Sequence, residues 1–176
     1  ALGGITYGVS DLELTAAYAA IANGGQYRKP VFYTKVTDSK GNVLIDYTEA
    51  KATQVFKAST ASLLTSAMED VVEKGTGIAC RLDNMHAAGK TGTTNEAKDL
   101  VFAGFTPYYT AAIWAVYDTH AEFPESDREF HKRLWAKVMN EIHEGLADMD
   151  FETSATVQEA TICTKTGLLA RSSCPS

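Results

Sequence analysis

The sequence predicts an α+β fold, an antiparallel sheet with helices packed on its face. Segments with helical periodicity are followed along the chain by short segments rich in β-branched and aromatic residues. Short turns join successive strands, which favours antiparallel pairing. The chain has 176 residues, of which 45% are hydrophobic, so it is large enough to bury a core.

The first half of the chain predicts a helix, a hairpin and a second helix. A capping box at 10–13 starts a helix that ends at Gly24 and Gly25. Residues 29–37 and 43–47 read as two strands, and 38–42 as their turn. The second helix is expected over about 59–74. Its apolar stripe comprises Leu63, Leu64, Ala67, Met68, Val71 and Val72.

The second half predicts three strands, a helix and a tail. The strands are expected at 86–94, 101–106 and 110–118, as an antiparallel meander. A capping box at 126–129 starts a helix that stops at Gly145. From 147 onward the periodicity fades, so we expect an extended tail over 147–176 after a folded part over 1–146. The last helix is expected to bury Phe130, Leu134, Trp135, Val138, Met139 and Ile142.

Composition narrows the function classes. The net charge of −6 argues against nucleic-acid binding. The longest apolar stretch, 109–117, is far shorter than the roughly 20 residues of a membrane helix. The chain begins with Ala1 rather than Met, and we expect it to be part of a longer protein. No cysteine or histidine cluster has zinc spacing, so neither a metal nor a cofactor is expected.

Three cysteines leave one unpaired in any disulfide scheme. Cys163 and Cys174 lie close together in a tail rich in threonine and serine. A bridge between them and two separate thiols are equally compatible with the sequence. Cys80 is interpreted as a small buried side chain rather than a nucleophile.

Residues 89–94, GKTGTT, form the clearest functional motif. On a strand, Thr91 and Thr93 point to one face and can together bind one carboxylate. Lys90 adds a positive charge from the other face. Gly92 lacks the Cβ that would hold a ligand off the backbone. The N–H of Thr93 can then face a developing oxyanion. We therefore predict Lys90 and Thr93 as catalytic residues, and Thr91, Gly92 and Thr93 as substrate-binding residues.

The sequence argues against two other interpretations of such a motif. A phosphate-binding loop needs a glycine at position 84, where Asn84 stands. A second Lys-Thr-Gly at 165–167 lacks a hydroxyl at the fourth position and lies in the aperiodic tail. We interpret that second copy as structural.

The motif resembles the Lys-Thr-Gly box of penicillin-binding proteins, which are serine acyl enzymes. Further segments, in this order, resemble the C-terminal part of the transpeptidase domain of the class A, bifunctional members: 2–10, 16–25, 72–77, 104–107, 113–118 and 163–175. The resemblance implies the transpeptidase fold and assigns 1–146 to the C-terminal portion of that domain.

The resemblance also implies a function. Members cross-link peptidoglycan stem peptides through a serine acyl-enzyme and are acylated by β-lactams. They act at the extracytoplasmic face of the bacterial cell membrane, with an anchor expected upstream. The implied partners are the upstream part of the same protein, stem peptides and β-lactams. Lys90 would link to a second motif, and Thr91 and Thr93 would bind the terminal carboxylate.

Two further boxes of the family, Ser-x-x-Lys and Ser-x-Asn, do not occur in the chain. The resemblance places both upstream, so we expect this chain alone to be inactive. We also expect it to be poorly soluble unless another chain covers its exposed sheet edge. Open alternatives are a non-catalytic β-lactam sensor, a serine β-lactamase or D,D-carboxypeptidase of the same superfamily, and a structural adhesion module.

Overall fold

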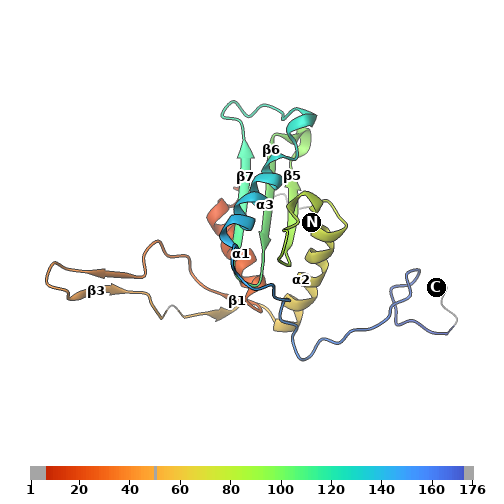
Figure 1. Cartoon of the computed structure of the whole chain (residues 1–176), viewed down its shortest axis with the longest axis horizontal. Helices are drawn as coiled ribbons and strands as arrows, with labels where there is room; N and C mark the ends of the chain where they lie inside the picture. Colours follow the sequence, from red (N-terminus) through yellow and green to blue (C-terminus); the bar gives the residue numbers. More distant parts are fainter. Residues whose placement is uncertain (1–6, 50, 173–176) are drawn as a thin grey trace.

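The computed structural model describes residues 7–49 and 51–172. Its centre is a three-stranded antiparallel sheet in the order β5-β6-β7 (Figure 1). The strands are β5 (Ala88–Thr93), β6 (Asp99–Phe105) and β7 (Thr110–Val116). The predicted meander is confirmed. β5 and β7 are shorter than the expected 86–94 and 110–118, whereas β6 starts two residues earlier than the expected 101–106 and ends one residue sooner, because the chain turns before 99 and after 105.

Helices cover both faces of this sheet. Phe105 of β6 packs against Ile21 of α1 (Asp11–Ala22) and Met68 of α2 (Ala58–Glu73). Phe102, three residues earlier on β6, packs instead against Trp135 of α3 (Phe130–Ile142). Side chains three apart on a strand point to opposite faces. The α+β prediction is confirmed, with α1 and α2 on one face and α3 on the other (Figure 1).

The first helix begins and ends as its sequence predicts. The Ser10 hydroxyl accepts a hydrogen bond from the Glu13 N–H at 3.3 Å. The Glu13 carboxylate accepts one from the Ser10 N–H at 2.8 Å, which completes the capping box. Gly24 and Gly25 follow the helix with positive φ angles, a conformation that glycine adopts without steric cost.

The predicted hairpin forms an arm that projects from the body (Figure 1). Its strands are β2 (Lys35–Thr37) and β3 (Val43–Asp46), joined by a turn in which Asp38 accepts from the N–H groups of Lys40 and Asn42. The prediction of a strand from 29 was too long, because only 35–37 pairs with a neighbour. Sequence reasoning also missed a small antiparallel pair, β1 (Gln26–Tyr27) with β4 (Thr53–Gln54), at the base of the arm.

The predicted buried stripe of α2 was partly wrong. Leu63 and Leu64 are 61% and 38% exposed. Met68 and Val72 are buried as predicted, together with Ala61 and Thr65, which the prediction omitted. The apolar residues of α2 span a wide arc, and contact with β5 selects the part of that arc that becomes buried.

The third helix differs more from its prediction. Ser126 lies in a short 3-10 turn, η3 (Glu125–Asp127), and its hydroxyl donates to Asp127, so the expected capping box does not form. Trp135 and Met139 are buried as predicted. The other four predicted core residues form a stripe exposed by 40–49%, which we call the α3 stripe: Phe130, Leu134, Val138 and Ile142.

The tail leaves the body in an extended path (Figure 1). Phe151 still contacts Phe105, with ring centroids 5.5 Å apart. Within 147–172 the only regular pairing is an isolated bridge between Ile162 and Leu169. The question of a Cys163–Cys174 bridge lies outside the described residues, since Cys174 is not among them. The resembling segments at 2–6 and 173–175 also lie outside them.

Candidate functional site

The motif strand β5 lies at an edge of the three-stranded sheet. The N–H of Thr94 donates to the carbonyl of Asp99 at 3.2 Å. Hydrogen-bonded and non-hydrogen-bonded pairs alternate along an antiparallel ladder. Since Thr94 is hydrogen-bonded to β6, the alternate residues Thr93 and Thr91 are not. Their N–H groups therefore point away from β6, toward the open edge. Two backbone donors are thus available to a ligand that lies along β5.

Thr91 and Thr93 lie on the same face of the sheet. Thr91 is opposite Phe102 and Thr93 is opposite Leu100 on β6. Directly opposite residues share a face, and Phe102 packs against α3, so both hydroxyls belong to the α3 face. Thr91 is half-buried and Thr93 is exposed. The two hydroxyls and the edge N–H groups can converge on one anionic ligand.

Lys90 begins on the opposite face and reaches around the open edge. Its Nζ lies 2.9 Å from the carbonyl oxygen of Thr91 and 3.5 Å from the Thr91 hydroxyl. The lysine is exposed, so its charge is accessible from solvent. Lys90 and Thr91 therefore place a cation beside a hydroxyl at the same strand edge.

Gly92 leaves open space beside this group. A Cβ built on Gly92 meets only Val101 Cβ, at 3.5 Å, which is an ordinary contact. The backbone could carry a side chain here without a clash. Its absence leaves the backbone of β5 uncovered on the Lys90 face, opposite the two threonine hydroxyls.

A neighbouring loop supports Thr91 in a way that sequence reasoning missed. Thr76 follows α2, and its hydroxyl lies 2.8 Å from the Thr91 hydroxyl. Lys132 of α3 donates to the Thr76 carbonyl at 3.0 Å and to Glu129 at 2.5 Å. The side chain of Lys132 is only 10% exposed. The sequence marked 75–77 as the end of a helix, but nothing in it pairs Thr76 with Thr91 or Lys132.

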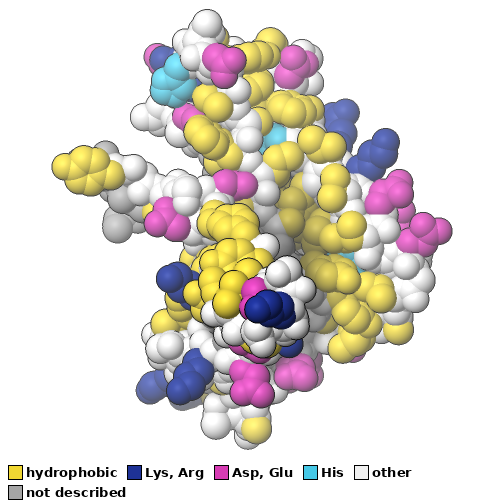
Figure 2. Space-filling view, turned by 90° about the vertical axis from the view of Figure 1, so that its left-hand side faces the viewer, with side chains coloured by type: hydrophobic (Ala, Val, Ile, Leu, Met, Phe, Trp, Pro, Cys, Tyr) yellow, Lys and Arg dark blue, Asp and Glu magenta, His cyan; other side chains and the backbone are white. Residues whose placement is uncertain are grey.

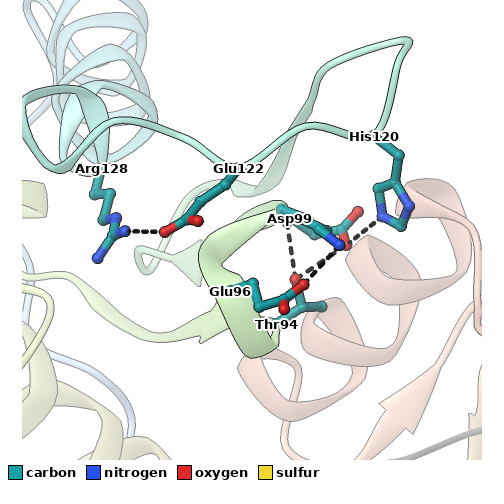
Figure 3. Close-up of polar contacts among 7 residues, drawn as sticks. Thr94, Glu96, Asp99, His120, Glu122 and Arg128 are labelled. Atoms are coloured by element: carbon teal, nitrogen blue, oxygen red, sulfur yellow. Dashed lines mark hydrogen bonds and ion pairs between the residues drawn. The ribbon is translucent and has the colours of Figure 1, made fainter.

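A second polar cluster, also missed, lies just beyond the motif (Figure 3). Asp99 accepts hydrogen bonds from the Thr94 hydroxyl at 3.1 Å and from Trp114 Nε1 at 3.0 Å, and its carboxylate lies 3.3 Å from His120 Nε2. Partial burial raises the pKa of Asp99, but the hydrogen bonds from Trp114, His120 and Thr94 outweigh burial and lower it overall. Asp99 thus holds the end of β5 against β7 and the following loop.

Other residues singled out in the sequence lie away from this strand edge. Cys80 is fully buried in the core beside Trp135, and burial raises the pKa of its thiol to about 12, so its interpretation as an inert core residue is confirmed. The second motif copy forms a turn in which the Thr166 and Gly167 N–H groups donate to Cys163 O, so it does not lie on a strand as the first copy does. Among the described residues, no group of three or more His, Cys, Asp or Glu could hold a metal ion.

This arrangement of a lysine and two threonines on an open strand edge can be compared with known families. The family model described as the penicillin-binding protein transpeptidase domain matches residues 1–144. The chain belongs to this family. The resemblance inferred from the motif and its flanking segments is therefore confirmed.

Curated relatives of this transpeptidase segment are much longer than the chain. It is 34% identical over 172 residues to Penicillin-binding protein 1A of Clostridium perfringens, covering 98% of the chain and 20% of that protein. It is 42% identical over 119 residues to Penicillin-binding protein 4 of Bacillus subtilis, covering 68% of the chain and 19% of that protein. The chain thus spans about a fifth of the length of these relatives.

Solved structures share the fold. The PonA1 protein of Mycobacterium tuberculosis in complex with penicillin V superposes with a TM-score of 0.70 at 27% identity, covering 79% of the chain and 39% of that structure. Penicillin-Binding Protein 1A of Haemophilus influenzae gives a TM-score of 0.81 at 22% identity, covering 95% of the chain and 31% of that structure. None of the helices described in the transpeptidase segment has the length and apolar character needed to cross a membrane.

Proposed function

We propose that the protein to which this segment belongs is a serine D,D-transpeptidase of peptidoglycan. It cross-links stem peptides through a serine acyl-enzyme and is acylated by β-lactams. The observation that carries this proposal is the open edge of β5, where Lys90, two threonine hydroxyls and two outward N–H groups lie together. These are the groups that a terminal carboxylate and an adjacent reacting carbonyl require.

Each residue has a distinct part in this proposal. Thr91 and Thr93 donate their hydroxyl protons to the terminal carboxylate of the stem peptide or of the drug. Lys90 supplies the positive charge beside them. The outward N–H of Thr93 donates to the oxyanion of the acylation step, a contribution of about 3–4 kcal/mol in acyl-transfer enzymes. Gly92 lets the ligand approach the backbone.

The nucleophile comes from elsewhere in the same protein. No serine of this chain has a lysine three residues later or an asparagine two residues later. Within 7–49 and 51–172, no strand pairs with the outer edge of β7. This edge and the exposed α3 stripe beside it support docking of the upstream part of the protein there. In this proposal the assembled domain lies at the extracytoplasmic face of the membrane, with the anchor in the upstream part.

Intact-mass measurement with a penicillin tests the proposal. The full-length protein is expected to gain one drug mass on a serine outside this chain, and the isolated chain to gain none. Lys90→Met is expected to slow acylation of the full-length protein at least about 100-fold, by analogy with loss of an oxyanion donor. Thr37→Val, on the projecting arm, serves as the control and should leave the rate unchanged.

The outcomes separate the alternatives. A drug adduct mapped to one of this chain's own serines contradicts the proposal. Rapid release of hydrolysed drug indicates a β-lactamase instead. A stable adduct on a protein that does not cross-link stem peptides indicates a sensor.

A further inference from the structure

Thr91 takes part in a polar chain that extends from the strand edge into the protein. Its hydroxyl lies 2.8 Å from that of Thr76, and the Thr76 carbonyl accepts from Lys132 Nζ at 3.0 Å. Lys132 also pairs with Glu129 at 2.5 Å. Thr76 therefore links three separate parts of the fold: β5 through Thr91, its own loop after α2, and the start of α3 through Lys132.

We propose that Thr76, held in place by Lys132, is a positioning residue for Thr91 and thereby sets the preference of the domain for ligands with a free carboxylate. This inference rests on the proposed function. The inference extends the proposed function because it assigns roles to Thr76 and Lys132, which lie outside the motif strand.

The number of protons on each group determines which group donates in the hydrogen bonds between Thr76, Thr91 and the ligand. A carboxylate only accepts, so Thr91 must donate its one hydroxyl proton to the ligand. The Thr91 oxygen is then left to accept, and the Thr76 hydroxyl at 2.8 Å is placed to donate to it. A hydrogen bond donated by Thr76 restricts the rotation of the Thr91 hydroxyl and polarises its O–H bond toward the carboxylate. Lys90 Nζ, 3.5 Å from the same oxygen, acts in the same sense.

Lys132 explains why the Thr76 loop stays in position. Thr76 is flanked by Gly75 and Gly77, which have no side chains to anchor the loop. Lys132 is almost fully withdrawn from water, and a buried ammonium needs partners. Glu129 and the Thr76 carbonyl provide them. Movement of the loop would leave that charge without one of its acceptors, so the buried lysine holds Thr76 against β5.

The test compares two β-lactams, a penicillin with its free carboxylate and the methyl ester of the same penicillin. Acylation rates are measured on the full-length protein. Thr76→Val keeps the shape of the side chain and removes the donor. It is expected to slow acylation by the free acid about 3- to 10-fold, the value of one hydrogen bond, while the ester rate changes little. Thr76→Ser should restore the ratio of acid to ester rates, and Thr37→Val should leave it unchanged.

A double-mutant cycle tests the part played by Lys132. Lys132→Met is expected to lower the same rate ratio, with little further effect when Thr76 is already valine. Melting temperatures show whether each variant is folded. An unchanged ratio in folded Thr76→Val, or an equal loss of both rates, overturns the inference alone. Absence of acylation of the unmodified protein by the free acid overturns the proposed function, and the inference with it.

Discussion

Gly104 and Gly92 occupy neighbouring strands, but their surroundings differ sharply. A Cβ built on Gly104 meets Phe102 at 2.6 Å, Trp135 at 2.9 Å and the Ala88 carbonyl at 3.0 Å. One built on Gly92 meets only Val101, at 3.5 Å. The first glycine allows α3 to pack closely on the sheet. The second leaves the β5 backbone uncovered on the Lys90 face, opposite the two threonine hydroxyls.

Alanine substitutions at these two glycines should therefore have opposite effects. Gly104→Ala is expected to lower the free energy of unfolding by about 1–3 kcal/mol, because the core cannot accommodate the methyl group without strain. Gly92→Ala should leave stability almost unchanged and slow acylation by a penicillin. Denaturant unfolding of the full-length protein measures the change in stability, and acylation rates measure the effect on the reaction with a penicillin. A stable Gly104→Ala or a fully active Gly92→Ala would contradict the corresponding assignment.

At the scale of elements, the Asp99 carboxylate connects three segments through polar contacts. Its carboxylate binds Thr94 beside β5 and His120 in the loop after β7 (Figure 3). It also accepts from Trp114 on β7. The Asp99 side chain is 20% exposed. This cluster fixes the end of β5 that follows Thr93, although it makes no contact with the predicted ligand side.

Stability should depend on pH through Asp99. Its folded-state pKa is lowered from the ordinary value of 3.8, so its ionised form stabilises the fold above that value. The contribution is lost as pH falls through the lowered pKa. Asp99→Asn is expected to cost about 1–3 kcal/mol at pH 7. The cost should shrink below about pH 4.

Melting temperatures at pH 7 and in acid measure this difference. Asp118→Asn, at an exposed position, is the matched control. A destabilisation by Asp99→Asn that is the same at both pH values contradicts the assigned electrostatic origin.

At the scale of the whole molecule, the side around β7 and α3 exposes a strand edge and hydrophobic side chains. β7 forms a sheet edge, and the α3 stripe is 40–49% exposed on one face beside it. On the other face of β7, Trp114 is 55% exposed. Figure 2, which views the molecule from the side of the β7 edge, shows many hydrophobic side chains at the surface. Exposed apolar area of this kind is typical of a surface that another segment covers.

The isolated chain is therefore expected to self-associate. Replacing Leu134, Val138 and Ile142 together by lysine should reduce self-association of the isolated chain. It should also destabilise the full-length protein, because in the proposed assembly the upstream part covers the stripe. Light scattering and thermal unfolding measure the two effects. Lys137→Gln, on the exposed face of the same helix, is the control. A monodisperse, cooperatively melting isolated chain would contradict this expectation.

The sequence by itself determined the local features of this protein. Capping at Ser10, the meander from β5 to β7 and the motif at 89–94 depend on residues close together in the chain, so short-range patterns reveal them. The family resemblance was also readable, because its segments keep their order along the chain. The placement of Thr91 and Thr93 on one face followed from strand periodicity alone.

Tertiary structure decided which side chains have partners. Periodicity identifies a helix but does not choose the face that is covered, so Leu63 and Leu134 were assigned to the core and are exposed. Thr76 and Lys132 are 56 positions apart, and Trp114 is 15 from Asp99. Such contacts depend on how α2, α3 and β7 pack around β5. No local pattern encodes them, because their energy comes from groups that only the folded chain brings together.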